Sequence, residues 1–533
     1  MNMKRFLSLF VIALAITLPG KAQNESTPLR KLNLATYAVD RFYVDSVNEN
    51  KLVEDAIIGM LQELDPHSTY MNPDEVKEMN EPLQGNFDGI GVQFNMLNDT
   101  LFIINTIVGG PSEKVGVLAG DRIIAVNDTT IAGVKMSTND IMKRLRGQKG
   151  TQVKIDVLRR NVKDPITFKI TRDKIPIYSI DATYMADSHT GYIRVSRFGA
   201  STWEEFVEAL DKLKKEGMKN LILDLQGNGG GYLNAAIGMA NEFLGANQLI
   251  VYTEGRKSPR EEALSNNEGS FKEGKLIVLV DESSASASEI VSGAIQDLDR
   301  GVIVGRRTFG KGLVQRPIPL PDGSMIRLTV SRYYTPSGRS IQKPYENGVE
   351  DYNKDLINRF NKGELSNADS IHFPDSLRYK TLYKERTVYG GGGIMPDLFV
   401  PLDTTRYTDA HRDIVANGVM NQYVINYFDR NQQELKSKYP DFATFDKDFT
   451  VTPEMLDALK TDAEKDKLKI APEQFEKSAP LIALQIKALI ARDMFDISDY
   501  FRVMNNENDS YKKALQLIND DAAYQKILTP SVK

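Results

Sequence analysis

The segment LIVLVDESSASASE, residues 276–289, sets the expectations for the fold of this chain. Its apolar first half predicts a strand over Lys275–Asp281, and the small residues after it lead into a predicted helix over Ser286–Leu298. A strand that runs almost directly into a helix is typical of β-α-β units. The turn between them places the hydroxyl of Ser286 at the beginning of a helix. The segment therefore predicts an α/β fold and a candidate serine nucleophile.

The same alternation continues on both sides of this segment. Strands and helices are predicted in turn at Gly191–Val195, Trp203–Lys215, Leu221–Leu225, Tyr232–Leu244 and Val302–Gly305. Crossover connections of this kind give a largely parallel sheet with helices packed on it. We therefore expect an α/β core over residues 173–404.

A lysine among glycines follows the strand Val302–Gly305, in the segment TFGKGLVQ, residues 308–315. Taken singly, a serine at a helix start is most often an N-cap, and a lone lysine is most often a solvated charge. A serine hydroxyl needs a base, and a lysine can be that base where burial lowers its pKa from about 10.4 toward about 7–8. Gln315 lies on the same side of an extended segment as Lys311, so its amide oxygen is expected to accept a hydrogen bond from the amine. Together the segments predict a Ser286–Lys311 pair.

The glycine-rich turn DLQGNGGG, residues 224–231, is the third segment expected at this site. Glycines between a strand and a helix let the backbone approach another group closely, and N–H groups at a helix start can hold an anion. A tetrahedral oxyanion needs two such donors. The N–H groups of Ala287 and Gly230 are our candidates, and a tight turn without chemistry is the alternative.

Six motifs in the same order closely resemble those of the carboxyl-terminal processing peptidases, also called tail-specific proteases. They are DPHSTYM (65–71), FDGIGV (87–92), GDRIIAVN (120–127), SASASE (284–289), TFGKGLVQ (308–315) and GGIMPD (392–397). The resemblance covers about residues 30–400 and implies a peptidase core of crotonase-like fold with an inserted PDZ domain. By position it implies Ser286 as nucleophile, Lys311 as general base and Gln315 as the residue that orients the lysine. The glycine turn departs from the family pattern twice, with Gln226 in place of Arg and Gly229 in place of Pro.

Short Val-, Ile- and Phe-rich strands between residues 85 and 171 predict a small β-rich domain, which the resemblance identifies as the PDZ domain. PDZ domains bind peptide C-termini by adding a strand to a sheet edge, while backbone N–H groups hold the terminal carboxylate. The resemblance implies that Gly89, Ile90, Gly91 and Val92 form the carboxylate loop. It implies Ile90–Phe94 as the pairing strand and Thr138–Leu145 as the helix beside the groove. A β-domain that keeps the fold without binding peptides is the alternative.

Polar helical patterns predict helices before the PDZ domain and after residue 405. Lys4 and Arg5, followed by the apolar run Phe6–Leu18 and by Gly20 and Ala22, predict an export signal cleaved after Ala22. The expected order is a signal peptide (1–22), an N-terminal helical region (23–82), a PDZ domain (83–172), a peptidase core (173–404) and a C-terminal helical domain (405–533). We expect an exported, periplasmic protein, or one on the outer face of the inner membrane if the signal is retained.

Composition excludes several other classes of protein. The chain has 533 residues, no cysteine and a net charge of −5, so disulfides, thiol catalysis and lipid attachment through cysteine are excluded, and nucleic acid is not an expected partner. Its four histidines are scattered, so neither a metal nor any other cofactor is expected. A serine–histidine triad stays open on the residues alone, although no histidine lies near the serine turn and His67 is interpreted as structural.

A nucleotide-binding P-loop is also disfavoured. GRRTFGK, residues 305–311, has P-loop spacing, but Gly312 replaces the required Ser or Thr, and Pro317, Pro319 and Pro321 forbid the helix that should follow.

The sequence thus predicts an exported serine endopeptidase that captures the C-terminal tails of proteins and cleaves them through an acyl-enzyme. Peptides or proteins with free C-termini are the expected partners, and a homodimer or larger assembly is also expected from apolar helices near the C-terminus. The resemblance further suggests that the PDZ domain gates the dyad. The competing hypothesis is a non-catalytic scaffold that gathers exported proteins in its PDZ groove.

Overall fold

The computed structural model describes residues 27–530, so the expected signal peptide (1–22) lies outside the described residues. The chain divides into two compact units, residues up to Leu64 and residues from Asp65 onward. The first unit contains two helices, α1 (Thr27–Phe42) and α2 (Glu49–Gln62). Asn48 caps α2 by accepting a hydrogen bond from the Lys51 N–H at 3.1 Å. Residues 29–63 have the apolar spacing of two helices, and both are present, although α1 buries none of its side chains.

The PDZ domain is an antiparallel sheet with two helices and its own core. Its strand order is β3-β4-β5-β7-β8, with β6 paired to β5. The strands are β3 (Val92–Leu97), β4 (Thr100–Thr106), β5 (Arg122–Val126), β6 (Thr129–Thr130), β7 (Gln152–Leu158) and β8 (Ile166–Thr171), and the helices are α4 (Pro111–Lys114) and α5 (Thr138–Leu145). The core is formed by alternate strand residues, such as Val153, Ile155 and Val157, that point toward Ile141 of α5. The predicted helix Thr138–Leu145 is confirmed at both ends, and Ser137 caps it.

A two-stranded ribbon and one helix lead into and out of the PDZ domain. The ribbon pairs β2 (Asn86–Gly89) with β9 (Asp173–Pro176). Helix α3 (Pro73–Gln84) precedes it and ends at Gly85, whose φ of 73° is a left-handed conformation that suits glycine. The two ends of the PDZ domain are thus hydrogen-bonded to each other, as an inserted domain requires.

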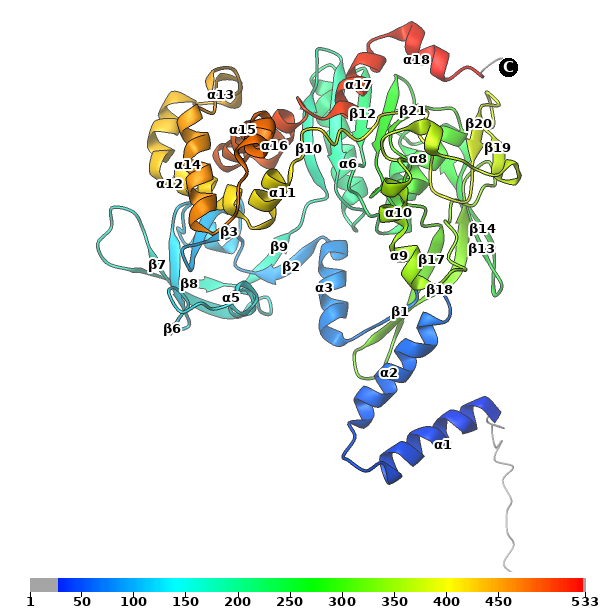
Figure 1. Cartoon of the computed structure of the whole chain (residues 1–533), viewed down its shortest axis with the longest axis horizontal. Coiled ribbons are helices and arrows are strands. Elements are labelled where there is room, and N and C mark those ends of the chain that lie inside the picture. Colours follow the sequence, from blue (N-terminus) through cyan, green and yellow to red (C-terminus); the bar gives the residue numbers. More distant parts are fainter. Residues whose placement is uncertain (1–26, 531–533) are drawn as a thin grey trace, which may run out of the picture. The chain divides into compact units, whose positions relative to one another are not determined.

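The peptidase core is built on a six-stranded sheet in the order β10-β11-β12-β15-β16-β21 (Figure 1). Its members are β10 (Ile180–Met185), β11 (Thr190–Val195), β12 (Asn220–Asp224), β15 (Leu276–Val280), β16 (Val302–Gly305) and β21 (Leu398–Phe399). Only the β10–β11 pair is antiparallel, so the predicted, largely parallel sheet is confirmed.

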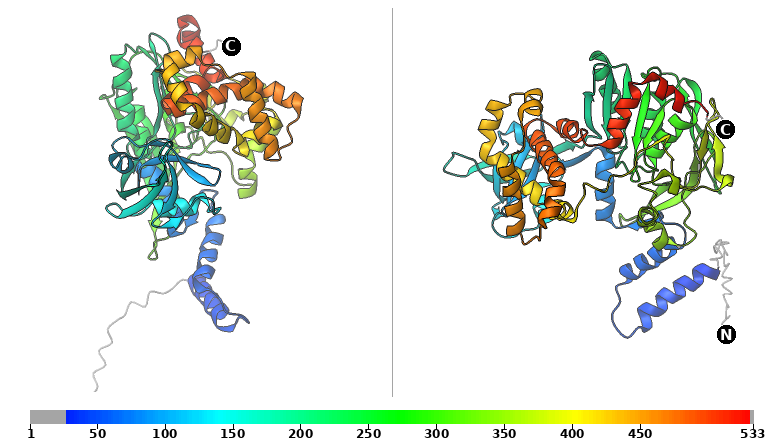
Figure 2. Two further views of the ribbon diagram at one scale, coloured as in Figure 1. Left: turned by 90° about the vertical axis from the view of Figure 1, so that its left-hand side faces the viewer. Right: turned by 45° about the horizontal axis from the view of Figure 1, so that its top comes forward.

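Both faces of this sheet are buried. Alternate residues of β15 point to opposite faces: Val278 joins the core formed with α6 (Thr202–Lys215), α7 (Leu233–Asn241) and α8 (Ala287–Asp297), whereas Ile277 joins a second core. That second core is closed by α17 (Asp509–Ile518) and α18 (Asp521–Ile527), which lie against the other face (Figure 2). Strands covered on both faces are continuously apolar, which is why this part of the sequence was readily identified.

A second, antiparallel sheet lies beside the first and contributes one wall of the site. Its order is β1-β18-β13-β14, with β17 paired to β18. The strands are β1 (Thr69–Met71), β13 (Ala246–Gly255), β14 (Ser258–Asn266), β17 (Leu313–Pro319) and β18 (Met325–Tyr334). The residue pattern of Ser324–Tyr334 predicts a strand, and the structure has one there as β18. The β13–β14 hairpin was not predicted, because polar residues cover much of β14.

Between β18 and β21 the chain forms short elements only. They are α9 (Val349–Asn353), α10 (Asp355–Asn361), β19 (Arg378–Lys380), β20 (Thr387–Tyr389) and two 3₁₀ turns over Ala368–Ser370 and Asp375–Leu377.

The C-terminal helices divide between two hydrophobic cores. A bundle with its own core contains α11 (Asp409–Ala416), α12 (Val419–Lys438), α13 (Phe442–Asp448), α14 (Pro453–Lys465) and α15 (Pro472–Met494), followed by α16 (Ile497–Met504). Ile425 of α12 packs on Leu97 and Phe102 of the PDZ sheet, and Asp429 pairs with Arg122 at 2.7 Å. The expected single domain over residues 405–533 therefore splits, because α17 and α18 bury their apolar faces on the peptidase sheet.

Two predicted helices in this region are each broken in two. The helical pattern of Asp413–Asp429 predicts one helix. In the structure it is interrupted at Gly418, which has a φ of 73°, and α11 and α12 form instead. The helical pattern of Tyr511–Ile527 likewise predicts one helix, but the structure interrupts it before Asp520, which caps α18.

Candidate active site

A cavity of about 1060 Å³ brings together the residues expected at the site. Ser286 enters it from the start of α8, and Lys311 and Gln315 enter from β17 and the loop before it. Gly230 and Ala287 line the same space. Ser286, Ala287 and Gly230 come from turns that follow strands of the parallel sheet, where ligand sites of α/β folds are usually found, whereas Gln315 comes from β17 of the second sheet.

Ser286 occupies an uncommon backbone conformation for a residue with a side chain. Its φ is 56° and its ψ is −112°, in a sharp turn between β15 and α8. Non-glycine residues at positive φ are strained, and such strain persists only where the surrounding structure imposes it. Here the surrounding contacts are reciprocal: the Ser286 N–H donates to Glu289 Oε2 at 2.8 Å, and the Glu289 N–H donates to the Ser286 carbonyl at 2.8 Å. The serine is therefore held by its own helix.

Glu289 joins the serine turn to the lysine loop, a role that the sequence did not indicate. Besides the Ser286 N–H, its fully buried carboxylate accepts hydrogen bonds from the Gly310 N–H at 2.8 Å, the Lys311 N–H at 2.9 Å and the Thr308 hydroxyl at 2.5 Å. Burial raises its pKa to about 7, although these four donors favour the charged form. The capping pattern Ser-x-x-Glu was visible in the sequence, but its contact with the later glycine–lysine loop was not.

Lys311 lies in surroundings that favour a neutral amine. Burial lowers its pKa to about 8, the positive charge of Arg327 lowers it further, and the carboxylates of Glu289 and Asp65 oppose the shift. Within residues 27–530, no carboxylate lies within ion-pair distance of its amine. The Tyr333 hydroxyl is 2.7 Å from the Lys311 carbonyl and 3.2 Å from the Ser286 carbonyl, so a second bridge fixes the two backbones relative to each other.

The expected oxyanion donors are adjacent, and they differ in their hydrogen bonds. A Cβ placed on Gly230 would lie 2.9 Å from the Ala287 nitrogen and 2.8 Å from Ser286 Cβ, so only glycine fits there. The Gly230 N–H donates to Asn228 Oδ1 at 2.9 Å. The Ala287 N–H, in the first turn of α8, donates to no acceptor among the described residues. One donor is free in this structure, and the other is held by a side chain of its own turn.

Gln315 lines the side of the cavity formed by the second sheet, and His67 lies in the turn before β1. Gln315 Nε2 donates to Thr329 Oγ1 at 3.3 Å, and Thr329 is its cross-strand partner on β18. His67 Nε2 lies 2.7 Å from the Tyr352 hydroxyl, and burial lowers its pKa to about 4, so the ring is neutral near pH 7. Among the residues from 27 to 530, the ring makes no hydrogen bond to Ser286.

The expected carboxylate loop of the PDZ domain has free N–H groups. Gly91 has a φ of 73°, and its carbonyl accepts from the Ile107 N–H at 3.0 Å. The Ile90 carbonyl accepts from Ser112, whereas the N–H groups of Ile90 and Gly91 donate to no acceptor in the part of the chain that the structure describes. The pairing strand begins at Val92 rather than at Ile90, because the left-handed turn at Gly91 delays it. Gly89 ends the preceding strand β2.

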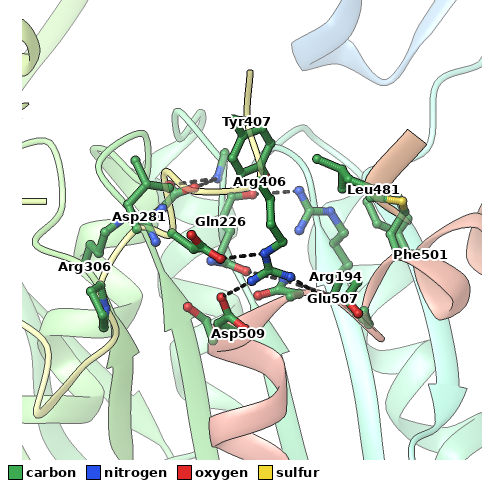
Figure 3. Close-up of a pocket in the computed structure, with 18 of the residues that line it drawn as sticks. Arg194, Gln226, Asp281, Arg306, Arg406, Tyr407, Leu481, Phe501, Glu507 and Asp509 are labelled. Carbon is green, nitrogen blue, oxygen red and sulfur yellow. Dashed lines mark hydrogen bonds and ion pairs between the residues drawn. The ribbon is translucent and has the colours of Figure 1, made fainter. Parts of the chain in front are cut away.

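A second, polar pocket of about 330 Å³ borders the same glycine turn at Gln226 and Gly227 (Figure 3). Arg406 lies in it and pairs with Asp403 at 2.6 Å, with Asp509 at 2.8 Å and with Glu507. Asn508 Nδ2 donates to Gln226 Oε1 at 2.9 Å. Gln226, one of the two departures from the family pattern, thus contacts the C-terminal helices.

Neither a metal cluster nor a membrane-spanning helix is found in residues 27–530. No group of three or more His, Cys, Asp and Glu side chains there is arranged to hold a metal ion. None of the helices in that range combines the length and the apolar character needed to cross a bilayer.

Comparisons with known proteins assign several segments of the chain to known families. Family models match residues 189–351 (Peptidase family S41), 89–173 (PDZ domain), 15–75 (Activating protease CtpB N-terminal domain) and 410–496 (a family of unknown function, DUF8443). The Carboxy-terminal-processing protease of Bartonella bacilliformis is 37% identical over 340 residues, which cover 63% of this chain and 77% of that protein. The Carboxy-terminal processing protease CtpA of Bacillus subtilis is 35% identical over 359 residues, covering 64% and 76%.

A solved structure titled photosystem II D1 C-terminal processing protease is 30% identical, covers 60% of this chain and 91% of that chain, and gives a TM-score of 0.34.

Fold and family models together define a serine-type peptidase with an inserted PDZ domain. The chain belongs to peptidase family S41, among the carboxy-terminal processing proteases.

Proposed function

We propose that this chain is an exported serine endopeptidase that cleaves protein tails with Ser286 as nucleophile and Lys311 as general base. The observation that carries the proposal is the environment of Lys311: a buried amine whose pKa is lowered to about 8, in the same cavity as Ser286. A lysine can act as a base near neutral pH only if burial keeps part of it neutral. Glu289 and Tyr333 connect both backbones and hold the pair together.

The proposed reaction is acyl transfer in two halves. Ser286 Oγ forms a bond to the scissile carbonyl carbon while its proton moves to Lys311 Nζ. The Ala287 N–H, joined by the Gly230 N–H once it turns from Asn228, stabilises the oxyanion. When the C–N bond breaks, the ammonium of Lys311 protonates the leaving amine and an acyl-enzyme remains. Water then attacks the ester, Lys311 accepts its proton, and that proton returns to Ser286 Oγ as the acid product leaves.

The PDZ domain is proposed to supply the substrate tail. A peptide that extends the sheet beside β3 would place its terminal carboxylate at the free N–H groups of Ile90 and Gly91. The same chemistry requires an unblocked C-terminus, so an amidated peptide should be cleaved less efficiently.

The proposal that the protein is exported rests on its N-terminal segment alone. N-terminal sequencing of the secreted protein tests cleavage after Ala22.

The dyad is tested by incubating wild type, Ser286→Ala and Lys311→Ala with an unstructured peptide that has an apolar, free C-terminus. We expect cleavage by wild type only, together with an acylated form of wild type detectable by intact mass after a rapid acid quench. Matched controls are Ser283→Ala, an exposed serine of the same turn, and Lys215→Ala, an exposed lysine of α6. Cleavage by both active-site variants, or by none of the proteins, contradicts the dyad.

A further inference from the structure

The turn Asp65–Ser68, part of the DPHSTYM motif, makes contacts that the proposed reaction does not use. It precedes β1, which pairs with β18 in the register Thr69 to Arg327. The Ser68 hydroxyl oxygen accepts a hydrogen bond from the Thr329 N–H at 3.1 Å, and Thr329 Oγ1 donates to Asp65 Oδ1 at 3.0 Å. Thr329 is also the cross-strand partner of Gln315. The turn is therefore connected to the residue expected to orient Lys311.

Asp65 is a buried acceptor, 8% exposed, surrounded by donors. Its carboxylate accepts from the His67 N–H at 2.8 Å, the Ser68 N–H at 2.9 Å and the Ser68 hydroxyl at 2.6 Å, in addition to Thr329. An ionised carboxylate has no proton to donate, so every partner must supply one. The single hydroxyl proton of Thr329 is therefore committed to Asp65.

This commitment decides the orientation of the Gln315 amide. Because the hydroxyl proton of Thr329 is donated to Asp65, Thr329 Oγ1 can only accept a hydrogen bond from Gln315. Gln315 must therefore present its NH₂ group to Thr329, in agreement with the 3.3 Å contact between Gln315 Nε2 and Thr329 Oγ1. The carbonyl end, Oε1, is then left for another donor. Lys311 borders the same cavity and carries such donors. We propose that Asp65 and Thr329 are positioning residues, which act through Gln315 to fix how the Lys311 amine is oriented for proton transfer.

The orientation of the Gln315 amide affects proton transfer because the neutral amine of Lys311 has only one lone pair. If Gln315 presents Oε1, the amine donates a proton to it and its lone pair stays available for the Ser286 proton. If the amide were reversed, its NH₂ group would donate to that lone pair and compete with the serine. In the buried series of hydrogen bonds from Asp65 through Thr329 to Gln315, only one orientation of the amide gives every donor an acceptor. The low local dielectric makes the reversed orientation costly in free energy. The inference rests on the proposed function, since it concerns how the Lys311 amine of the proposed Ser286–Lys311 dyad is oriented.

The decisive variants change one hydroxyl. Thr329→Val removes the hydroxyl and keeps the shape, and Thr329→Ser keeps the hydroxyl. For Thr329→Val we expect kcat to fall about 10- to 100-fold with KM changed less than about twofold, as for a misplaced catalytic group. The midpoint of the pH–rate profile should move to lower pH, because the ammonium form of Lys311 loses its acceptor. Thr329→Ser should restore kcat to within about threefold.

Two further measurements separate this role from simple support of the fold. Thr167→Val is a matched control: this threonine also lies on a strand and donates to an aspartate, Asp156, but in the PDZ sheet. It should leave kcat and the midpoint unchanged. In a Gln315→Met background, Thr329→Val should have no additional effect on kcat, because the positioning acts through Gln315.

An unchanged kcat and midpoint for Thr329→Val, or an equal loss in Thr329→Ser, overturns the inference. If Thr329→Val does not fold, Ser68→Ala must shift the midpoint in the same direction, and an unshifted midpoint overturns it. Failure of the proposed function is distinguishable, because Lys311→Ala would then remain active. An inactive Lys311→Ala with a normal Thr329→Val refutes only the positioning role.

Discussion

The cavity around Lys311 and the pocket around Arg406 both border the glycine turn after β12, but their cations have opposite surroundings. Arg406 contacts three carboxylates, and its pKa is raised, chiefly by the hydrogen bond to Asp403. Lys311 has no such partner among residues 27–530, and burial lowers its pKa to about 8. Carboxylate partners therefore determine the behaviour of each basic side chain. Arg406, which has them, stays charged and holds neighbouring segments together, whereas Lys311, which lacks them, can lose its proton near neutral pH.

The carboxylate of Glu289 is buried behind the cavity, and it accepts hydrogen bonds from backbone N–H groups. Glu289 accepts hydrogen bonds from the N–H groups of Ser286, Gly310 and Lys311, so it orders the loops instead of pairing with the lysine amine. Its influence on the amine is a smaller, opposing one. The carboxylate therefore lies close to Ser286 and Lys311 without forming a salt bridge, which would stabilise the protonated form of the amine.

The largest effect on activity is expected when Lys311 is replaced by arginine, the residue type found at position 406. Lys311→Arg keeps the positive charge, but a guanidinium cannot be deprotonated in a protein, so kcat/KM should fall about 10³-fold or more. Initial rates on the free-C-terminus peptide measure this. The reciprocal change, Arg406→Lys, should keep activity within about twofold. Near-normal activity of Lys311→Arg would show that Lys311 is not the base.

The next effect concerns the buried carboxyl group of Glu289. The folded-state pKa of Glu289 is raised from 4.5 to about 7, so its contribution to stability is present below pH 4.5 and lost as pH rises through 7. That loss amounts to about 3 kcal/mol at most. Glu289→Gln cannot titrate, so the decrease in its thermal midpoint between pH 5 and pH 8 should be smaller than in wild type, as calorimetry can measure. An identical decrease in both proteins would contradict the raised pKa.

The third effect is the pH dependence of kcat/KM, which should follow the protonation of the Lys311 amine. Because only the neutral amine of Lys311 can act, kcat/KM should rise about tenfold per pH unit below pH 8 and level off above it. Measurements of kcat/KM between pH 6 and pH 10 test this, with unfolding followed in the same buffers. A profile that is flat from pH 6 to pH 9 would exclude the lysine base.

The smallest effect is expected in the pocket of paired charges. Arg406→Met leaves three carboxylates without their shared cation, but the arginine side chain is 29% exposed, so the cost should be about 1 kcal/mol and should shrink with added salt. Arg412→Met, whose arginine is 66% exposed, is the matched control and should cost almost nothing. Peptidase activity should change less than about twofold in both variants. A large activity loss in Arg406→Met would mean that this pocket also governs the chemistry.

The sequence predicted most completely what is encoded in short, contiguous segments. The buried parallel strands, helix α5 and the segments containing Ser286, Lys311 and Gln315 each have a local signal, and the structure places those three residues in one cavity. The link through Glu289 and the chain from Asp65 to Thr329 could not be predicted in the same way. Each joins residues far apart in sequence by a side-chain hydrogen bond, and no periodicity reports such a contact.

Surface strands and the partners of amphipathic helices were also difficult to predict. The hairpin β13–β14 carries Arg260, Glu261 and Glu262 on one strand, which hides the alternation typical of a sheet. The C-terminal helices have clear apolar faces, but a face does not say which surface covers it. The structure shows that those of α17 and α18 belong to the peptidase sheet.

The covering of the peptidase sheet by α17 and α18 has a consequence for biosynthesis. Ser286 and Lys311 emerge from the ribosome long before Tyr524, whose hydroxyl accepts from the Leu276 N–H at 3.2 Å and donates to the Leu276 carbonyl at 3.0 Å. Until that segment is translated, one face of the sheet that leads into Ser286 is uncovered, so the fold around Ser286 and Lys311 is complete only after the C-terminal helices have been made.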